Sequence, residues 1–187
     1  MLRLTLFIFV IMTLPAAAHP GQDHADALAG FLHPLTGVDH VAAMLAVGAW
    51  SALIGGSRLW AWPLAFIGAM IAGGILGHIG FTMPLVEQSI AASLVVIGLL
   101  LALAVNASAT GGVFVVATFA LFHGFAHGCE AGNAAWLPFT SGFVGATALL
   151  HLAGIGAARG LMLMFNALPV RVIGAVTAVA GITLLMK

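Results

Sequence analysis

The stretch LWAWPLAFIGAMIAGGILGHIGF (residues 59–81) decides the class of fold. It contains no Asp, Glu, Lys or Arg, and it is longer than the run of about 20 apolar residues that a helix needs to cross a bilayer. The whole chain shares this character, because 63% of its 187 residues are hydrophobic and 5% are charged. A soluble domain carries about 25% charged residues. We therefore expect a membrane protein, and the composition excludes soluble enzymes.

The charges also argue against nucleic acid as a partner. Five Lys and Arg balance five Asp and Glu, and the cations are scattered rather than gathered in a basic patch. The single Cys129 excludes an intrachain disulfide and any CxxC motif. Eight histidines among so few charged residues are the unusual feature of the composition.

Apolar stretches of transmembrane length recur along the chain. We expect residues 19–187 to form one all-α domain, a bundle of six transmembrane helices. Strands are not expected, because transmembrane β-strands alternate apolar and polar residues over about ten positions. The spacing Gly73-xxx-Gly77 predicts a close contact between two helices. The six expected helices cover residues 34–54, 59–81, 85–105, 111–129, 135–157 and 168–186.

Residues 1–18 have the organisation of a secretory signal peptide. A short positive segment ending at Arg3 precedes an apolar run, residues 4–14, that is too short to span a bilayer comfortably. Three alanines at 16–18 then supply the small-x-small pattern that signal peptidase recognises. We expect cleavage after Ala18; the alternative is an uncleaved N-terminal anchor.

The few charges set the expected orientation in the membrane. With the segment after the signal peptide outside, the inner connections and their edges carry Arg and no acid, which is the positive-inside distribution. An even number of spans then places both mature termini in the periplasm. The residues that support this orientation are Arg58, Arg159 and Arg171 inside, and Asp23, Asp26, Glu87 and Glu130 outside, where Lys187 is the only cation.

The first polar cluster is HPLTGVDH (residues 33–40), at the outer start of the first expected helix. Pro34 suits a first helical turn, where its missing N–H is not needed. His33 and His40 are seven residues apart, so on one helix they would share a face about 10 Å apart along the axis. Asp39 could orient the imidazole of His40 or coordinate a metal directly.

The second polar cluster is FHGFAHGCE (residues 122–130), at the outer end of the fourth expected helix. His123, His127 and Glu130 lie at i, i+4 and i+7 and so form one stripe. Two imidazoles one turn apart can close on a single cation, a spacing that helical metal sites use. Gly124 and Gly128 follow the two histidines and could let another backbone approach.

The two clusters are expected at one depth. The first helix runs inward from its cluster and the fourth runs outward to its own, so both clusters lie in the outer half of the membrane. His78, near the outer end of the second helix, joins them, whereas His151 lies in the inner half. Imidazole with carboxylate suits Ni, Co, Zn, Cu or Fe(II), and ionisable groups inside a membrane are costly and usually functional. The alternative for each histidine is a hydrogen-bonded polar residue between helices.

Both clusters resemble the signatures of the HupE/UreJ family of nickel/cobalt permeases, HPxxGxDH and FHGxAHGxE, at every fixed position. The resemblance implies a bacterial inner-membrane permease that imports Ni²⁺ or Co²⁺ for cytoplasmic metalloenzyme assembly. It implies no permanently bound cofactor, and its partners would be metallochaperones or maturation proteins. The residues that it marks as metal-handling are His33, Asp39, His40, His123, His127 and Glu130.

Two histidines near the mature N-terminus could act earlier. His19, the first residue after the expected cleavage, and His24 could capture a metal ion outside the cytoplasm; a tail without a role is the alternative. Other classes of function fit less well. An intramembrane metallohydrolase would carry a motif such as HExxH, which is absent, and a cytochrome would place histidines on facing helices near mid-span. A membrane metal-binding accessory protein that does not transport remains the alternative function.

Overall fold

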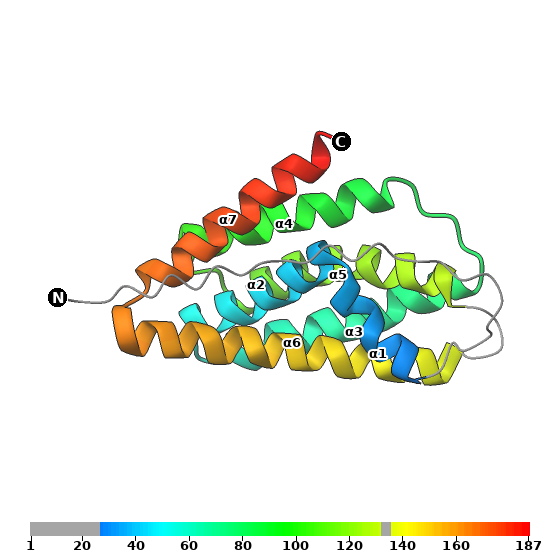
Figure 1. Cartoon of the computed structure of the whole chain (residues 1–187), viewed down its shortest axis with the longest axis horizontal. Helices are drawn as coiled ribbons and strands as arrows, with labels where there is room; N and C mark the ends of the chain where they lie inside the picture. The colour runs from blue at the N-terminus through cyan, green and yellow to red at the C-terminus, as the bar shows by residue number, and fades with distance from the viewer. Residues whose placement is uncertain (1–26, 132–135) are drawn as a thin grey trace.

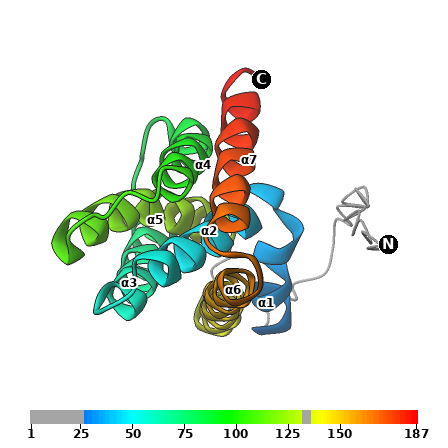
Figure 2. The ribbon, with the colours of Figure 1, turned by 90° about the vertical axis from the view of Figure 1, so that its left-hand side faces the viewer.

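The computed structural model describes residues 27–131 and 136–187, and within these ranges every regular element is an α-helix. From α2 onward each helix runs opposite to the one before it, while α1 crosses the face of α6 (Figure 1). Figure 2 shows α2 in the middle of the bundle. The all-α prediction is confirmed. The helices are α1 (Ala27–Thr36), α2 (Val38–Ile54), α3 (Arg58–His78), α4 (Val86–Ala102), α5 (Ala109–Glu130), α6 (Trp136–Phe165) and α7 (Leu168–Leu185).

Four of the described helices, α3, α5, α6 and α7, are long and apolar enough to cross a membrane. Helices α1 and α2 reach this length only as a pair, and the pair bends by 86°. Helix α4 has 17 residues, which is about 26 Å at 1.5 Å per residue, against a hydrocarbon core of about 30 Å. Length and composition therefore support four spans, or five if the bent pair counts as one. Six spans stay a prediction.

The expected continuous first helix, and with it the shared face of His33 and His40, is wrong. Gly37 is extended (φ −91°, ψ 112°) between α1 and α2, and Pro34 lies inside α1 rather than in a first turn. Glycine in a helix interior costs about 1 kcal/mol relative to alanine. The two helix ends that the break creates are also stabilised by side-chain hydrogen bonds. The Thr36 hydroxyl donates to the carbonyl of His33 at 2.7 Å. The Asp39 carboxylate accepts the backbone N–H of His40 at 2.9 Å.

Helices α3 and α5 pack with their backbones in contact. A Cβ atom added at Gly73 or Gly77 would overlap backbone atoms of α5, so the predicted close contact is confirmed. A Cβ atom at Gly124 or Gly128 would overlap backbone atoms of α3 in the same way. Because each of these two glycines follows a histidine, the contact holds the histidine-bearing turns of α5 against α3.

The end of the bundle opposite the start of α2 is held by two indoles. Trp50 and Trp62 are fully buried and stack with their ring centroids 3.9 Å apart. The Trp50 N–H donates to the carbonyl of Val105 at 3.1 Å, and the Trp62 N–H donates to that of Ala109 at 3.0 Å. These bonds tie α2 to the connection between α4 and α5, and α3 to the first residue of α5.

Helix α6 runs further than the sequence predicted. The expected end at residue 157 is wrong: α6 continues to Phe165, so Arg159 lies inside the helix. Residues 158–165 contain no proline, and the Leu-Met-Leu-Met sequence at 161–164 has a high helix propensity. The helix ends where Asn166 takes a positive φ of 79°.

The expected signal peptide, residues 1–18, lies outside the described residues. The expected metal-capturing histidines His19 and His24 also lie outside them. All three remain predictions from the sequence.

Candidate metal centre

Four histidine side chains form a chain of ring contacts at the end of the bundle where α2 begins. His33 of α1 contacts His127 of α5, with ring centroids 4.6 Å apart. His127 contacts His40 of α2 at 4.4 Å, and His40 contacts His123 of α5 at 4.8 Å. The side chain of His33 is 34% exposed, those of His127 and His40 are 9% and 11% exposed, and His123 is fully buried. The two sequence motifs therefore meet, as predicted, in one cluster that leads from the surface inward.

The exposed part of the cluster is centred on Glu130. One carboxylate oxygen, Oε2, accepts hydrogen bonds from His33 Nε2 at 2.8 Å and from His127 Nδ1 at 3.3 Å. One ligand atom from each of these three residues lies within 4.8 Å of the others. This separation lets two imidazoles and a carboxylate close on one metal ion. The bend at Gly37 makes it possible, because it carries His33 away from the axis of α2 and over α5.

Asp39 orients the imidazole of His40. Its Oδ1 atom lies 2.8 Å from His40 Nδ1. A carboxylate accepts hydrogen bonds, so Nδ1 carries the hydrogen and Nε2 of the neutral ring carries the lone pair. Glu130 orients His127 by the same rule, leaving its Nε2 as the atom with the lone pair.

Ser93 of α4 orients the third imidazole, that of His123. The Ser93 hydroxyl donates to the carbonyl of Ile90 at 2.6 Å, and its oxygen lies 3.0 Å from His123 Nε2. Since the hydroxyl hydrogen is already used, His123 Nε2 is the donor and Nδ1 carries the lone pair. Ser93 and His123 are both fully buried.

The three lone-pair nitrogens have no partner in the part of the chain that the structure describes. They are His40 Nε2, His123 Nδ1 and His127 Nε2, and all three are buried. A buried polar atom without a hydrogen bond costs about 1–3 kcal/mol. Imidazoles whose other nitrogen donates to a carboxylate or hydroxyl are the form in which histidines bind metal ions. The arrangement can hold a transition-metal cation.

Comparison with known proteins shows the family to which the chain belongs. The family profile described as "HupE / UreJ protein" matches residues 7–184. The chain is 41% identical over 180 residues to "Protein HupE" of Rhizobium leguminosarum bv. viciae, covering 94% of this chain and 93% of that protein. The chain belongs to the HupE/UreJ family. No solved structure matches it. Family membership and the apolar helices together identify a membrane protein of a transport and accessory family.

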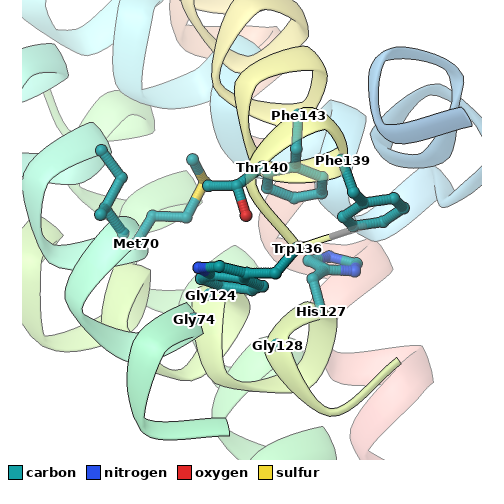
Figure 3. Close-up of a pocket in the computed structure, with 10 residues that line it drawn as sticks. Met70, Gly74, Gly124, His127, Gly128, Trp136, Phe139, Thr140 and Phe143 are labelled. Atoms are coloured by element: carbon teal, nitrogen blue, oxygen red, sulfur yellow. The ribbon is translucent and has the colours of Figure 1, made fainter. Parts of the chain in front are cut away.

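Two pockets flank the cluster of this HupE/UreJ chain. The first is drawn in Figure 3, where His127 lies beside Trp136, Phe139 and Phe143, with Met70 across from them. The second is lined by residues at the start of α2, in the first turns of α4 and at the end of α7, namely Asp39, Glu87, Gln88, Ala91, Leu184, Leu185 and Lys187. Asp39 therefore both lines a pocket and holds His40.

The two other histidines within the described residues, His78 and His151, make no ring contact with the four histidines of the ring chain. His78 is at the predicted end of the bundle, but its ring stacks on Trp136, with centroids 4.7 Å apart and planes 13° apart. His151 lies in the middle of α6 and is 1% exposed. Cys129 places its Sγ atom 3.9 Å from the carbonyl oxygen of Gly77, against α3.

Sequence reasoning missed Ser93. Its only signal is a hydroxyl within the otherwise apolar residues 90–102 of α4. Serine in a helix commonly bonds a carbonyl three or four residues back, and Ser93 does so. Its second contact, to His123, comes from the packing of α4 on α5 and is invisible in either segment alone.

Proposed function

We propose that the chain imports Ni²⁺ or Co²⁺ across the bacterial inner membrane through its histidine cluster. The observation that carries the proposal is the set of three buried imidazole nitrogens, on His40, His123 and His127, that have no partner in residues 27–131 and 136–187. Each ring is oriented by another side chain. Imidazole ligands supported by carboxylates suit Ni²⁺ and Co²⁺, and also other divalent transition metals, better than Mg²⁺ or Ca²⁺.

Capture begins at the exposed part of the cluster. The Glu130 side chain is 55% exposed and that of His33 is 34% exposed, so a hydrated cation can reach both. The negative charges of Glu130 and Asp39 attract the cation and offset its charge as water is removed. Glu87, which lines a pocket together with Asp39, adds a third acidic group at this end.

Dehydration follows as the cation moves inward along the ring chain. Nε2 of His127 is reached first, and Nε2 of His40 and Nδ1 of His123 then replace further water ligands. His127 contacts both His33 and His40, so it belongs to the exposed and the buried part of the path. Each step needs a neutral imidazole. The lone pairs of the three imidazoles stay available because the opposite ring nitrogens are held by Asp39, Ser93 and Glu130.

The charges support an orientation with the cluster towards the periplasm. Arg58 and Arg171 lie at the opposite end, at the starts of α3 and α7. The acids Asp39, Glu87 and Glu130 lie at the cluster end. By the positive-inside rule we propose that the cluster faces the periplasm and that both mature termini lie there. In this proposal α4 and the bent α1–α2 pair also cross the membrane, which makes six spans.

The test is uptake of radioactive nickel or cobalt by proteoliposomes that contain the purified full-length chain alone. We expect uptake that saturates with metal concentration and that Mg²⁺ does not inhibit. Metal binding by the purified protein without any uptake would instead establish the second function, a membrane metal-binding protein that serves metalloenzyme maturation. The buried part of the cluster fits either function; only the transporter needs a path beyond it.

A further inference from the structure

We infer that His151, with the thioether of Met70, forms a second cation station on the inner side of the cluster. The inference rests on the proposed import function and extends its path. The cation would leave His123 and bind Nε2 of His151 before release towards the cytoplasm. An imidazole nitrogen with a sulfur donor favours late transition metals over Mg²⁺ or Ca²⁺.

His151 has the same unpartnered chemistry as the cluster histidines. Its Nδ1 atom donates to the backbone carbonyl of Thr147, one turn earlier in α6, at 2.8 Å. Nε2 therefore carries the lone pair. That atom is buried and has no hydrogen-bond partner among the described residues. A histidine needed only for packing gains nothing from a buried, unpartnered nitrogen.

Two contacts connect His151 to the cluster. The ring of Phe66 lies 5.7 Å from the His123 ring and 5.0 Å from the His151 ring, measured between centroids. Met70 lines the pocket next to His127 (Figure 3), and its Sδ atom accepts the Thr147 hydroxyl at 3.5 Å. His151 is thus separated from His123 by one aromatic ring, and Met70 connects the pocket beside His127 to Thr147, whose carbonyl accepts from His151.

The position of His151 along the bundle fits a later step. A Cβ atom added at Gly48 of α2 would overlap the carbonyl of His151, so the two residues lie at one level. Gly48 comes eight residues after His40, which is about 12 Å further along α2. A cation that moves inward from His40 therefore meets His151 next. The Phe66 ring between His123 and His151 separates the two stations by an apolar barrier.

The substitution His151→Asn separates a ligand from a structural role. The asparagine amide can still donate to the Thr147 carbonyl, because it places its nitrogen near the position of Nδ1, but it has no atom in place of Nε2. The full-length variant is compared with the wild type in two measurements: Co²⁺ affinity of the purified protein by calorimetric titration, and initial uptake in proteoliposomes over a range of Co²⁺ concentrations. Ser51→Ala, which removes a buried hydrogen bond to the carbonyl of Val47, is the matched control.

We expect His151→Asn to bind Co²⁺ within about twofold of the wild type and to lose about tenfold or more in maximal uptake rate, since only translocation is affected. Met70→Leu, which conserves volume, should lower the rate less. Ser51→Ala should transport normally. Uptake by His151→Asn within about twofold of wild type would overturn the inference and leave the proposed function standing. Loss of Co²⁺ binding in His151→Asn would also overturn it, because His151 would then belong to the first site. A wild type that binds Co²⁺ and moves none would overturn the proposed function and this inference together.

Discussion

The two ends of the bundle differ in whether their buried polar groups have hydrogen-bond partners. At the end where α3 begins, the indole N–H groups of Trp50 and Trp62 both donate to carbonyls. The half-buried Arg58 at the same end is also satisfied, since it donates to Asn106 Oδ1 at 2.6 Å and to the carbonyl of Ala107 at 2.9 Å. At the end where α2 begins, three buried imidazole nitrogens have no partner among the described residues.

This difference separates stability from function. Satisfied polar groups contribute about 1 kcal/mol each to stability, whereas an unpartnered buried nitrogen lowers stability and calls for another explanation. We therefore expect substitutions at the histidine end to change metal handling while leaving the protein inserted. Substitutions at the tryptophan end should lower the stability of the protein while leaving its metal handling unchanged.

The largest expected effect is the loss of uptake in His40→Ala and His123→Ala. Each substitution should lower initial Ni²⁺ or Co²⁺ uptake by about 100-fold, because each removes a ligand from the same buried site. The double variant should be no worse than either single variant, since residues that act as one unit are not additive. Uptake is measured at matched membrane abundance. Residual activities that multiply in the double variant would show two independent sites.

The next effect concerns charge at the same end. Asp39→Asn keeps the shape of the side chain and its acceptor oxygen but removes the anion that offsets a desolvated divalent ion. We expect Co²⁺ affinity to fall about 10–100-fold, the range for partners that orient a metal-binding histidine. Calorimetric titration of the purified variant measures it. An unchanged affinity would mean that Asp39 acts only on the start of α2, through the N–H of His40.

Some features of the fold and of the histidine cluster could be predicted from the sequence, and others could not. The meeting of the two motifs was predictable, because alternating helices return the end of α5 to the start of α2. The bend at Gly37 was not, since Gly73 and Gly74 lie inside α3 without interrupting it. Glycine alone therefore does not decide where a helix breaks. His78 was placed at the right end but not against Trp136, because sequence sets depth along a bundle better than rotation about it.

A smaller effect is expected at Ser93. This residue sharpens the comparison because it is fully hydrogen-bonded, yet it lies at the end that holds the unpartnered imidazole nitrogens. Ser93→Ala removes the acceptor that fixes the tautomer of His123, so the apparent KM for Co²⁺ should rise about tenfold. Ser93→Thr keeps the hydroxyl and should recover most of the affinity. If Thr and Ala raise the KM equally, then packing at α4, rather than the hydrogen bond, is what matters.

The smallest effect on metal handling should come from Trp62→Phe, which is the converse test of the comparison. Phenylalanine keeps the stacking surface against Trp50 but removes the donor to the half-buried carbonyl of Ala109, a loss of about 0.5–1.5 kcal/mol. Thermal unfolding of the detergent-solubilised protein should therefore move to lower temperature. Co²⁺ affinity of the folded protein should stay within about twofold, because the Trp62 indole and the cluster lie at opposite ends of α3 and α5. A variant that unfolds at the wild-type temperature but binds Co²⁺ poorly would show that the two ends are coupled. The division of roles between the two ends would then be wrong.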